Sequence, residues 1–336
     1  MTQLDVAVIG AGYIARTHLP AWTGLGARIR LFATDGQVGP LADEFGATLA
    51  TSLHDAIAGA AVVDICTPTT THRDIALEAA EAGAHILCEK PMALCASEAQ
   101  DMAEAAARAG VQLYPGHVVR FFPAYVRLRA AVRTGQLGQV AVARFTRTGR
   151  YPTWSPWFAD TSQSGGILTD QMLHDMDIAR WLFGDVVRIH ATQRGHLTAP
   201  APVATGSATL THASGVISQV SGVWGPPATP FRYTFHVAGS KGTIFHDSQA
   251  HLGLRVIGGG GGDAAGIPTG DFGEDPFAVQ IREFAAAFQG GPPPRVDALD
   301  GVAAVRMAEA ARLSAVTGKA VQIDAPALLL TEGITS

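Results

Sequence analysis

The stretch VIGAGYIA, residues 8–15, decides the fold of the first half of the chain. It contains Gly10, Gly12 and Ala15, the G-x-G-x-x-A form of a strand-to-helix turn that binds dinucleotides. The first glycine permits a tight turn, the second lets backbone approach a pyrophosphate, and the small third residue lets the helix pack on the strand. Free N–H groups at the start of the helix, at Tyr13 and Ile14, would then face the phosphates. The pattern alone is weak evidence because glycine-rich turns are common, but here it follows an apolar run and precedes a helical one.

Around this turn, residues 4–120 alternate strand-like apolar runs with alanine-rich helical runs. The strand-like runs are residues 4–9, 29–34, 61–66, 84–88 and 111–114. Such alternation predicts a parallel sheet with helices on both faces. Thr71 with Asp74, and Ser97 with Gln100, predict the starts of two helices. Pro20 lies inside the first expected helix and should kink or end it.

The pattern changes after a short helix that Pro123 should open. Six β-rich segments follow, VAVARFTR, VVRIHATQ, ATGSATLTHA, GVISQVSGVW, RYTFHVAG and LGLRVIG. Most have no helix between them, which predicts an antiparallel sheet. Residues 258–275 are glycine-rich and should form a loop, and helices are expected over 276–288 and 302–317. The sequence thus predicts an α/β dinucleotide-binding domain at 1–122, followed by an α+β domain with a mostly antiparallel open sheet at 123–336.

Composition narrows the classes of function. Only 16% of residues are charged, the net charge is -5, and no basic block occurs, so neither nucleic acid nor an anionic membrane surface is expected as a partner. No apolar run approaches the ~18 residues of a membrane span, and the N-terminus lacks the lysines of a signal peptide. We therefore expect a soluble cytoplasmic protein. Its three cysteines, Cys66, Cys88 and Cys95, lack C-x-x-C spacing and should be free thiols.

Candidate ligand-binding residues follow each of the first four strands at its carboxyl end, where an open parallel sheet binds its ligands, and the glycine turn is the first of them. Asp35 follows the second strand, 23 residues after Gly12, and an acid there accepts the adenosine ribose hydroxyls of NAD. If Thr34 occupied this position instead, the 2′-phosphate of NADP would be better tolerated. We favour NAD, while Asp35 could also be an ordinary turn residue. Three more cofactor candidates follow the third strand: Thr67, Pro68 and His72, of which His72 could merely begin a helix.

The fourth strand ends in HILCEKPMA, residues 85–93. Glu89 and Lys90 therefore lie where the nicotinamide end of a dinucleotide is expected, and Pro91 restricts the backbone beside them. A lysine beside an acid is more often a solvated surface pair. After an apolar strand at the ligand-binding edge, a functional lysine is the better interpretation.

Three segments together resemble the glucose-fructose oxidoreductase and inositol dehydrogenase (Gfo/Idh/MocA) family. They are GAGYIARTHLPA, TPTTTHRDIALEAAEAGAHILCEKPMA and SGGILTDQMLHDMDIARWLFG, and the likeness covers nearly the whole chain. The resemblance implies an N-terminal Rossmann domain, a C-terminal domain with an open antiparallel sheet, NAD or NADP, and oxidation or reduction of sugars and inositols. It also implies catalytic roles for Lys90, Asp170 and His174, a cis bond before Pro91, and a homodimer or homotetramer. Ala15 replaces the family's third glycine.

The proposed catalytic residues suit hydride chemistry. One helix is expected over 167–183, on which Asp170, His174 and Asp177 would share a stripe. A histidine with a pKa near 6.5 can take the hydroxyl proton when a carbon loses hydride, and the carboxylate can fix its tautomer or hold substrate hydroxyls. Lys90 would polarise the same oxygen or relay its proton. A metal at Asp170 and His174 would need a third ligand, which is not evident, so no metal is expected; a satisfied core histidine is the other alternative.

Further residues are candidates for substrate contacts, namely His117, Arg120, Tyr151, Trp154 and Trp157. They offer hydrogen bonds and flat apolar faces that suit a polyol, but they could equally pack between domains. Asp175 and Asp177 are expected to be structural, as capping or ion-pairing groups.

The sequence therefore predicts an NAD(P)-dependent oxidoreductase that interconverts a hydroxyl and a ketone on a sugar, inositol or sugar derivative. Two alternatives stay open. One is a reductase of a C=C or C=N bond on the same scaffold, and the other is a dinucleotide-binding regulator without catalytic activity.

Overall fold

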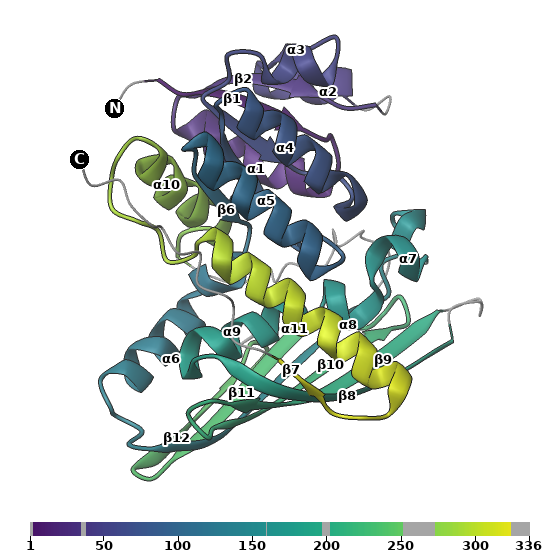
Figure 1. The fold of residues 1–336 in the computed structure, drawn as a ribbon, viewed down its shortest axis with the longest axis vertical. Helices are drawn as coiled ribbons and strands as arrows, with labels where there is room; N and C mark the ends of the chain where they lie inside the picture. Colours follow the sequence, from purple (N-terminus) through teal and green to yellow (C-terminus); the bar gives the residue numbers. More distant parts are fainter. Residues whose placement is uncertain (1–2, 35–37, 159, 197–201, 251–272, 324–336) are drawn as a thin grey trace.

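Two β-sheets organise the chain. The computed structural model describes residues 3–34, 38–158, 160–196, 202–250 and 273–323 (Figure 1). Within them, the strands form a six-stranded sheet near the N-terminus and a seven-stranded sheet in the second half. Among the described residues, no helix has the length and hydropathy that a bilayer crossing requires.

The first sheet is parallel throughout, with strand order β3-β2-β1-β4-β5-β6. Its strands are β1 (Asp5–Ile9), β2 (Arg28–Phe32), β3 (Thr48–Leu49), β4 (Val62–Ile65), β5 (His85–Cys88) and β6 (Leu113–Pro115). Its helices are α1 (Tyr13–Gly24), α2 (Val38–Phe45), α3 (Leu53–Ile57), α4 (His72–Glu81) and α5 (Ala96–Ala109), with a 3-10 turn η1 (Thr69–Thr71). The predicted parallel α/β fold is confirmed. The short strand β3 was not expected, because only two exposed residues form it.

Helix α1 continues through Pro20 to Gly24, so of the two expected effects of this proline, a kink or the end of the helix, the second did not occur. Pro20 lies on the exposed face. The opposite face buries Ala15, His18, Leu19 and Trp22, and this packing offsets the single hydrogen bond that proline removes.

The two predicted helix starts are correct to within two residues, but not in their capping. Helix α5 begins at Ala96, before Ser97, and Cys95 occupies its N-cap position without a side-chain hydrogen bond. Thr71 precedes α4, but its hydroxyl donates to the carbonyl of Pro68 instead of accepting from the helix.

The second sheet has the order β12-β11-β7-β10-β9-β8-β13. Its strands are β7 (Val140–Arg150), β8 (Val186–His196), β9 (Val203–His212), β10 (Ile217–Gly225), β11 (Arg232–Gly239), β12 (Gly242–Asp247) and β13 (Val321–Gln322). Only the β7–β10 pair is parallel, so the prediction of a mostly antiparallel sheet is confirmed. The strand expected in LGLRVIG and most of the expected glycine-rich loop lie outside the described residues.

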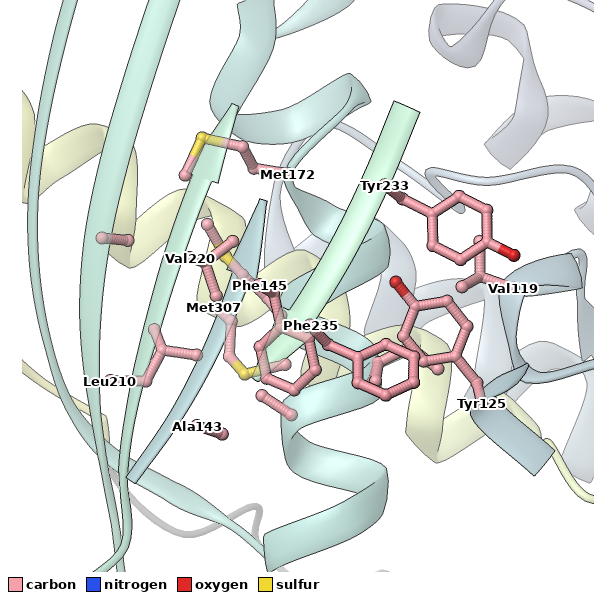
Figure 2. Close-up of a cluster of buried hydrophobic side chains, with 14 of the residues drawn as sticks. Val119, Tyr125, Ala143, Phe145, Met172, Leu210, Val220, Tyr233, Phe235 and Met307 are labelled. Atoms are coloured by element: carbon pink, nitrogen blue, oxygen red, sulfur yellow. The ribbon is translucent and has the colours of Figure 1, made fainter. Parts of the chain in front are cut away.

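Helices cover one face of this second sheet (Figure 1). They are α6 (Pro123–Arg133), α8 (Gly166–Asp170), α9 (Leu173–Phe183) and α11 (Ala298–Thr317), with the 3-10 turn η2 (Val118–Phe121). The short helix α7 (Thr161–Ser164) instead packs on the 3-10 turn η3 (Pro156–Phe158), on α8 and on η1. Figure 2 shows the core between the layers, where Phe145, Leu210, Val220 and Phe235 of the sheet lie beside Tyr125, Met172 and Met307.

The last two helices return to the first sheet. Helix α10 (Pro276–Phe288) packs on α1, and its Ile281 and Phe284 share a core with Val8 and Trp22. Helix α11 packs on α5 and β6 as well as on β8, and the capping box of Asp297 with Asp300 starts it four residues before the predicted start. These contacts hold the two sheets against each other around the site described next.

Candidate active site

A cavity of about 1000 Å³ lies where the carboxyl ends of the parallel strands face the second sheet. One part of its wall consists of the β1–α1 turn and the ends of β2, β4 and β5. The other part comes from η2, the end of β7, residues 154–158 and the junction of α8 with α9. Both halves of the chain therefore contribute to one cavity.

The glycine turn fits the pyrophosphate of a dinucleotide. Gly10 has φ +116°, and a side-chain carbon there would lie 2.5 Å from the carbonyl oxygen of Cys66, so only glycine is accommodated. At Gly12 the same carbon would meet no atom within 4 Å, which leaves open space above the turn. Helix α1 begins directly after Gly12 and has no acidic residue in its first turn, so its free N–H groups can bind phosphate oxygens.

Most of the predicted cofactor residues line this cavity. They are Gly10, Gly12, Tyr13, Ile14, Thr67, Pro68, Glu89 and Lys90, and Thr34 joins them. Asp35 lies outside the described residues. His72 does not reach the cavity wall, contrary to its prediction as a cofactor residue.

His72 instead links the loop that follows β4 to the loop that follows β5. It is buried, with Nδ1 2.9 Å from the carbonyl oxygen of Pro91 and Nε2 2.8 Å from that of Thr67. Burial lowers its pKa, which favours the neutral ring. The Lys90–Pro91 bond is cis, as the family resemblance implied. His72 therefore helps to hold the loop that presents Lys90.

Lys90 contacts a residue from the other half of the chain. Its Nζ donates to Oδ1 of Asp170 at 3.0 Å and to the carbonyl oxygen of Asp170 at 3.1 Å. The two side chains are only 15% and 17% exposed, so water screens this ion pair weakly. The pair fixes the ammonium group at the meeting point of the two cavity walls.

The chain between Asp170 and His174 does not form the single helix that was predicted. Helix α8 ends at Asp170 and α9 begins at Leu173. The break seats Met172 against the sheet, where a side-chain carbon at Gly206 would lie 2.6 Å from its sulfur. Asp170, His174 and Asp177 consequently do not share one helical stripe: the first two reach the cavity, while Asp177 is buried elsewhere.

His174 lines the cavity with Lys90 and Asp170. Its Nδ1 is buried and has no hydrogen-bond partner among the described residues. Burial holds its pKa well below the usual 6.5, and the nearby charges of Lys90 and Arg147 lower it further. The ring is therefore neutral at pH 7 and able to accept a proton.

A buried network beneath the glycine turn was missed in the sequence. His18 is fully buried, with Nδ1 3.0 Å from Asp64 and Nε2 3.3 Å from Glu89 Oε1. Trp22 also donates to Asp64, at 2.7 Å. His18, Asp64 and Cys66 lie within 4.8 Å of one another, the spacing of possible metal ligands, but they already hydrogen-bond within the group. An acid inside the apolar strand VVDI was the available signal, because a buried carboxylate needs a partner.

The predicted substrate residues divide into two groups. Trp154 and Trp157 line the cavity, whereas His117, Arg120 and Tyr151 do not. Tyr151 packs edge-on against Trp224, which does line it.

Of the two alternatives left open for Arg120, a substrate contact or packing within the protein, the structure supports the second. Arg120 is 1% exposed and donates twice to Asp177, at 2.8 Å and 2.6 Å, and once to Asp300, at 2.7 Å. His117 lies beside this pair, 3.7 Å from Asp177, and burial lowers its pKa. The prediction that Asp175 and Asp177 form ion pairs is confirmed, Asp175 with Arg147 and Asp177 with Arg120.

Comparison with known proteins identifies relatives over the whole chain. Residues 4–117 match the family described as oxidoreductase family, NAD-binding Rossmann fold, and residues 125–245 match the GFO/IDH/MocA C-terminal domain. Inositol 2-dehydrogenase of Rhizobium meliloti is 32% identical over 90% of this chain and 94% of its own. D-apiose dehydrogenase of Paraburkholderia graminis is 30% identical over 97% and 92%. The structure of GenD2 from gentamicin A biosynthesis, in complex with NAD, is 28% identical, with a TM-score of 0.86 over 97% of each chain.

Proposed function

Because this chain belongs to the Gfo/Idh/MocA oxidoreductase family, we propose that it interconverts a hydroxyl and a ketone on a sugar, inositol or sugar derivative. One observation carries the proposal: Lys90, Asp170 and His174 line a single cavity next to the dinucleotide turn. Relatives named as inositol, D-apiose and 1,5-anhydro-D-fructose enzymes support this class of substrate.

Each of the three residues has a role in this proposal. His174, neutral at pH 7, accepts the proton of the substrate hydroxyl and returns it in the reverse reaction. Lys90 donates a hydrogen bond to the same oxygen and stabilises the charge that develops there. Asp170 orients the Lys90 ammonium group through the ion pair between them.

The residues that would hold the dinucleotide are those of the glycine turn and the strand ends, Gly10 to Ile14, Thr67, Pro68 and Glu89. When bound, the nicotinamide supplies the acceptor or donor of the hydride. We favour NAD over NADP, because Asp35 follows β2 in the sequence and a relative from Bacillus subtilis is named scyllo-inositol 2-dehydrogenase (NAD(+)). A thermal-shift comparison of NADH with NADPH tests this preference, since the tighter ligand raises Tm more at equal concentration.

We further propose that residues 1–122 bind the dinucleotide and that residues 123–336 supply the substrate and subunit contacts of a homodimer or homotetramer. Light scattering of the purified protein tests the subunit number. We place the enzyme in the cytoplasm, where NAD(H) is available and the free thiols of Cys66, Cys88 and Cys95 stay reduced.

The test is turnover at 340 nm with NAD⁺ and a panel of inositols, aldoses and sugar derivatives, each run against the His174→Ala variant. We expect turnover with at least one polyol and a large loss in the variant. If the variant kept nearly full turnover, His174 would not be the base of this reaction. If no polyol reacted but NADH were oxidised with an unsaturated compound or an imine, a reductase of another double bond would be the better assignment. Tight NADH binding without any turnover would instead favour a regulator.

A further inference from the structure

The cavity contains one arginine that has no ionic partner among the described residues. Among the described residues, three side chains of lysine or arginine line it: Lys90, Arg147 and Arg150. Lys90 forms an ion pair with Asp170. Arg147 forms a bidentate ion pair with Asp175, with N–O distances of 3.0 Å and 2.7 Å.

Arg150 differs from the other two. Its guanidinium forms no hydrogen bond or ion pair with any residue that the structure describes, and it lies over the ring of Trp154, 5.5 Å from the ring centroid. It is the last residue of β7, so the strand fixes its backbone at the edge of the cavity. A guanidinium held in this way presents a planar donor edge to an incoming oxyanion.

The cavity wall contains a second unsatisfied group. Gln171, at the junction of α8 and α9, is 7% exposed and lines the cavity. Its Oε1 is buried without a partner in the described part of the chain. Its Nε2 faces Gly149, the neighbour of Arg150, and its Oε1 faces Gly222 of β10; side-chain carbons placed on these glycines would lie 3.8 Å and 2.7 Å from the two atoms. A buried acceptor left unpaired is costly, so this amide is poised to receive a ligand hydroxyl.

Aromatic rings complete this end of the cavity. Trp157 stacks on Phe158 with centroids 3.9 Å apart, and both line the cavity with Trp224. Flat apolar faces suit the C–H faces of a sugar ring.

We propose that the substrate is a sugar acid, a polyol that carries a carboxylate. This inference rests on the proposed function. The carboxylate pairs with Arg150, one ring hydroxyl donates to Gln171 Oε1, and the hydroxyl that is oxidised lies at Lys90 and His174. One unpaired positive charge matches a carboxylate of charge minus one better than a doubly charged phosphate. The start of α1 already provides N–H donors for the pyrophosphate of the dinucleotide, so Arg150 is left for the substrate.

The first experiment compares each acid with its neutral counterpart, D-glucuronate with D-glucose and D-galacturonate with D-galactose, on the enzyme with saturating NAD⁺. We expect kcat/KM for an acid to exceed that of its counterpart by ~10-fold or more, the scale of a charged hydrogen bond. In Arg150→Gln that preference should shrink by ~10- to 100-fold. Arg144→Gln is the matched control, because Arg144 lies on the same strand but is exposed and bonded to Gln219.

A second readout separates failure of this inference from failure of the proposed function. Calorimetric titration of the NADH complex with the same pairs measures binding without turnover. If an acid binds through Arg150 but is never oxidised, the anion site stands and the proposed reaction fails. If neutral sugars bind and react as well as acids, the sugar-acid inference is overturned and the reaction stands. Weaker NADH binding in Arg150→Gln, with the acid preference intact, would assign Arg150 to the dinucleotide and also overturn it.

Discussion

The buried carboxylate of Asp64 lies 3.0 Å from Nδ1 of His18, directly beneath the dinucleotide turn. Burial by itself would lower the pKa of His18, but Asp64 and Cys66 outweigh it and hold the pKa well above 6.5. The imidazole is therefore a cation at neutral pH, and its Nε2 faces the Glu89 carboxylate that precedes Lys90. A buried charge is tolerated only when it is paired, so the glycine turn and the Lys90 loop depend on the same ion pair.

Replacing His18 should show how much the folded state depends on the His18–Asp64 ion pair. We expect His18→Gln to lower the free energy of unfolding by ~3–5 kcal/mol at pH 7, because Asp64 is left buried without its cation. Since the folded-state pKa is raised, the stabilisation is complete below the unfolded value of ~6.5 and is lost as pH rises through the folded value. Urea unfolding across pH 6 to 10 should show that the difference in free energy of unfolding between the wild type and His18→Gln becomes smaller as pH rises. His190→Gln is the control, because His190 lies on the exposed side of β8. A stability difference between wild type and His18→Gln that did not change with pH would contradict a charged His18 imidazole.

The two glycines of the turn should respond differently to the same change. In Gly10→Ala the new carbon meets the carbonyl of Cys66 and the backbone has positive φ, so we expect Tm to fall and NADH binding to be lost together. In Gly12→Ala the carbon meets no protein atom, so Tm without ligand should stay within about a degree, since no contact is broken. Its NADH affinity should still fall by ~10-fold or more, because the carbon occupies the space that the pyrophosphate needs. If the two variants lost the same Tm, the conclusion that Gly10 is crowded by backbone while Gly12 faces open space would be wrong.

His174→Ala should lower kcat by ~100- to 10,000-fold, the usual contribution of a positioned base. The dissociation constant of NADH, measured by fluorescence, should change little. His54→Ala serves as the control, because His54 is 88% exposed on α3 and does not itself line the cavity. Loss of NADH binding in His174→Ala, instead of loss of turnover, would count against a role in proton transfer.

The pH profile provides an independent check on His174. Its pKa is lowered well below 6.5, so the ring loses its capacity as a base only when pH falls through that lowered value. We expect kcat/KM for oxidation to stay level from pH 8 down to ~6.5 and to decline only below it, as protonation removes the base. If kcat/KM instead declined with a midpoint at or above pH 6.5, a group other than His174 would be responsible for the decline.

Much of this arrangement could be predicted because local rules determine it. The turn at Gly10 and the Lys90 loop follow successive strands, and parallel strands bring their carboxyl ends to one edge. The break between α8 and α9 could not be predicted, because the space that Met172 needs is created by Gly206 and Gly222, on strands far along the chain. The spacing of apolar residues within 167–183 carries no information about those two glycines.

Arg120 fails as a predicted substrate residue for a related reason, and its replacement tests the correction. Arginine is seldom buried, so an arginine near the cleft indicated a ligand contact. Asp300 lies 180 positions away and, with Asp177, satisfies the guanidinium within the protein. Arg120→Lys keeps the charge but loses the two-pronged geometry, so we expect the free energy of unfolding to fall by ~1–3 kcal/mol in urea titrations. The KM for the sugar substrate and the affinity for NADH should not change, and Arg133→Lys, at the exposed end of α6, should alter neither stability nor KM. A raised KM in Arg120→Lys with unchanged stability would restore Arg120 as a substrate contact.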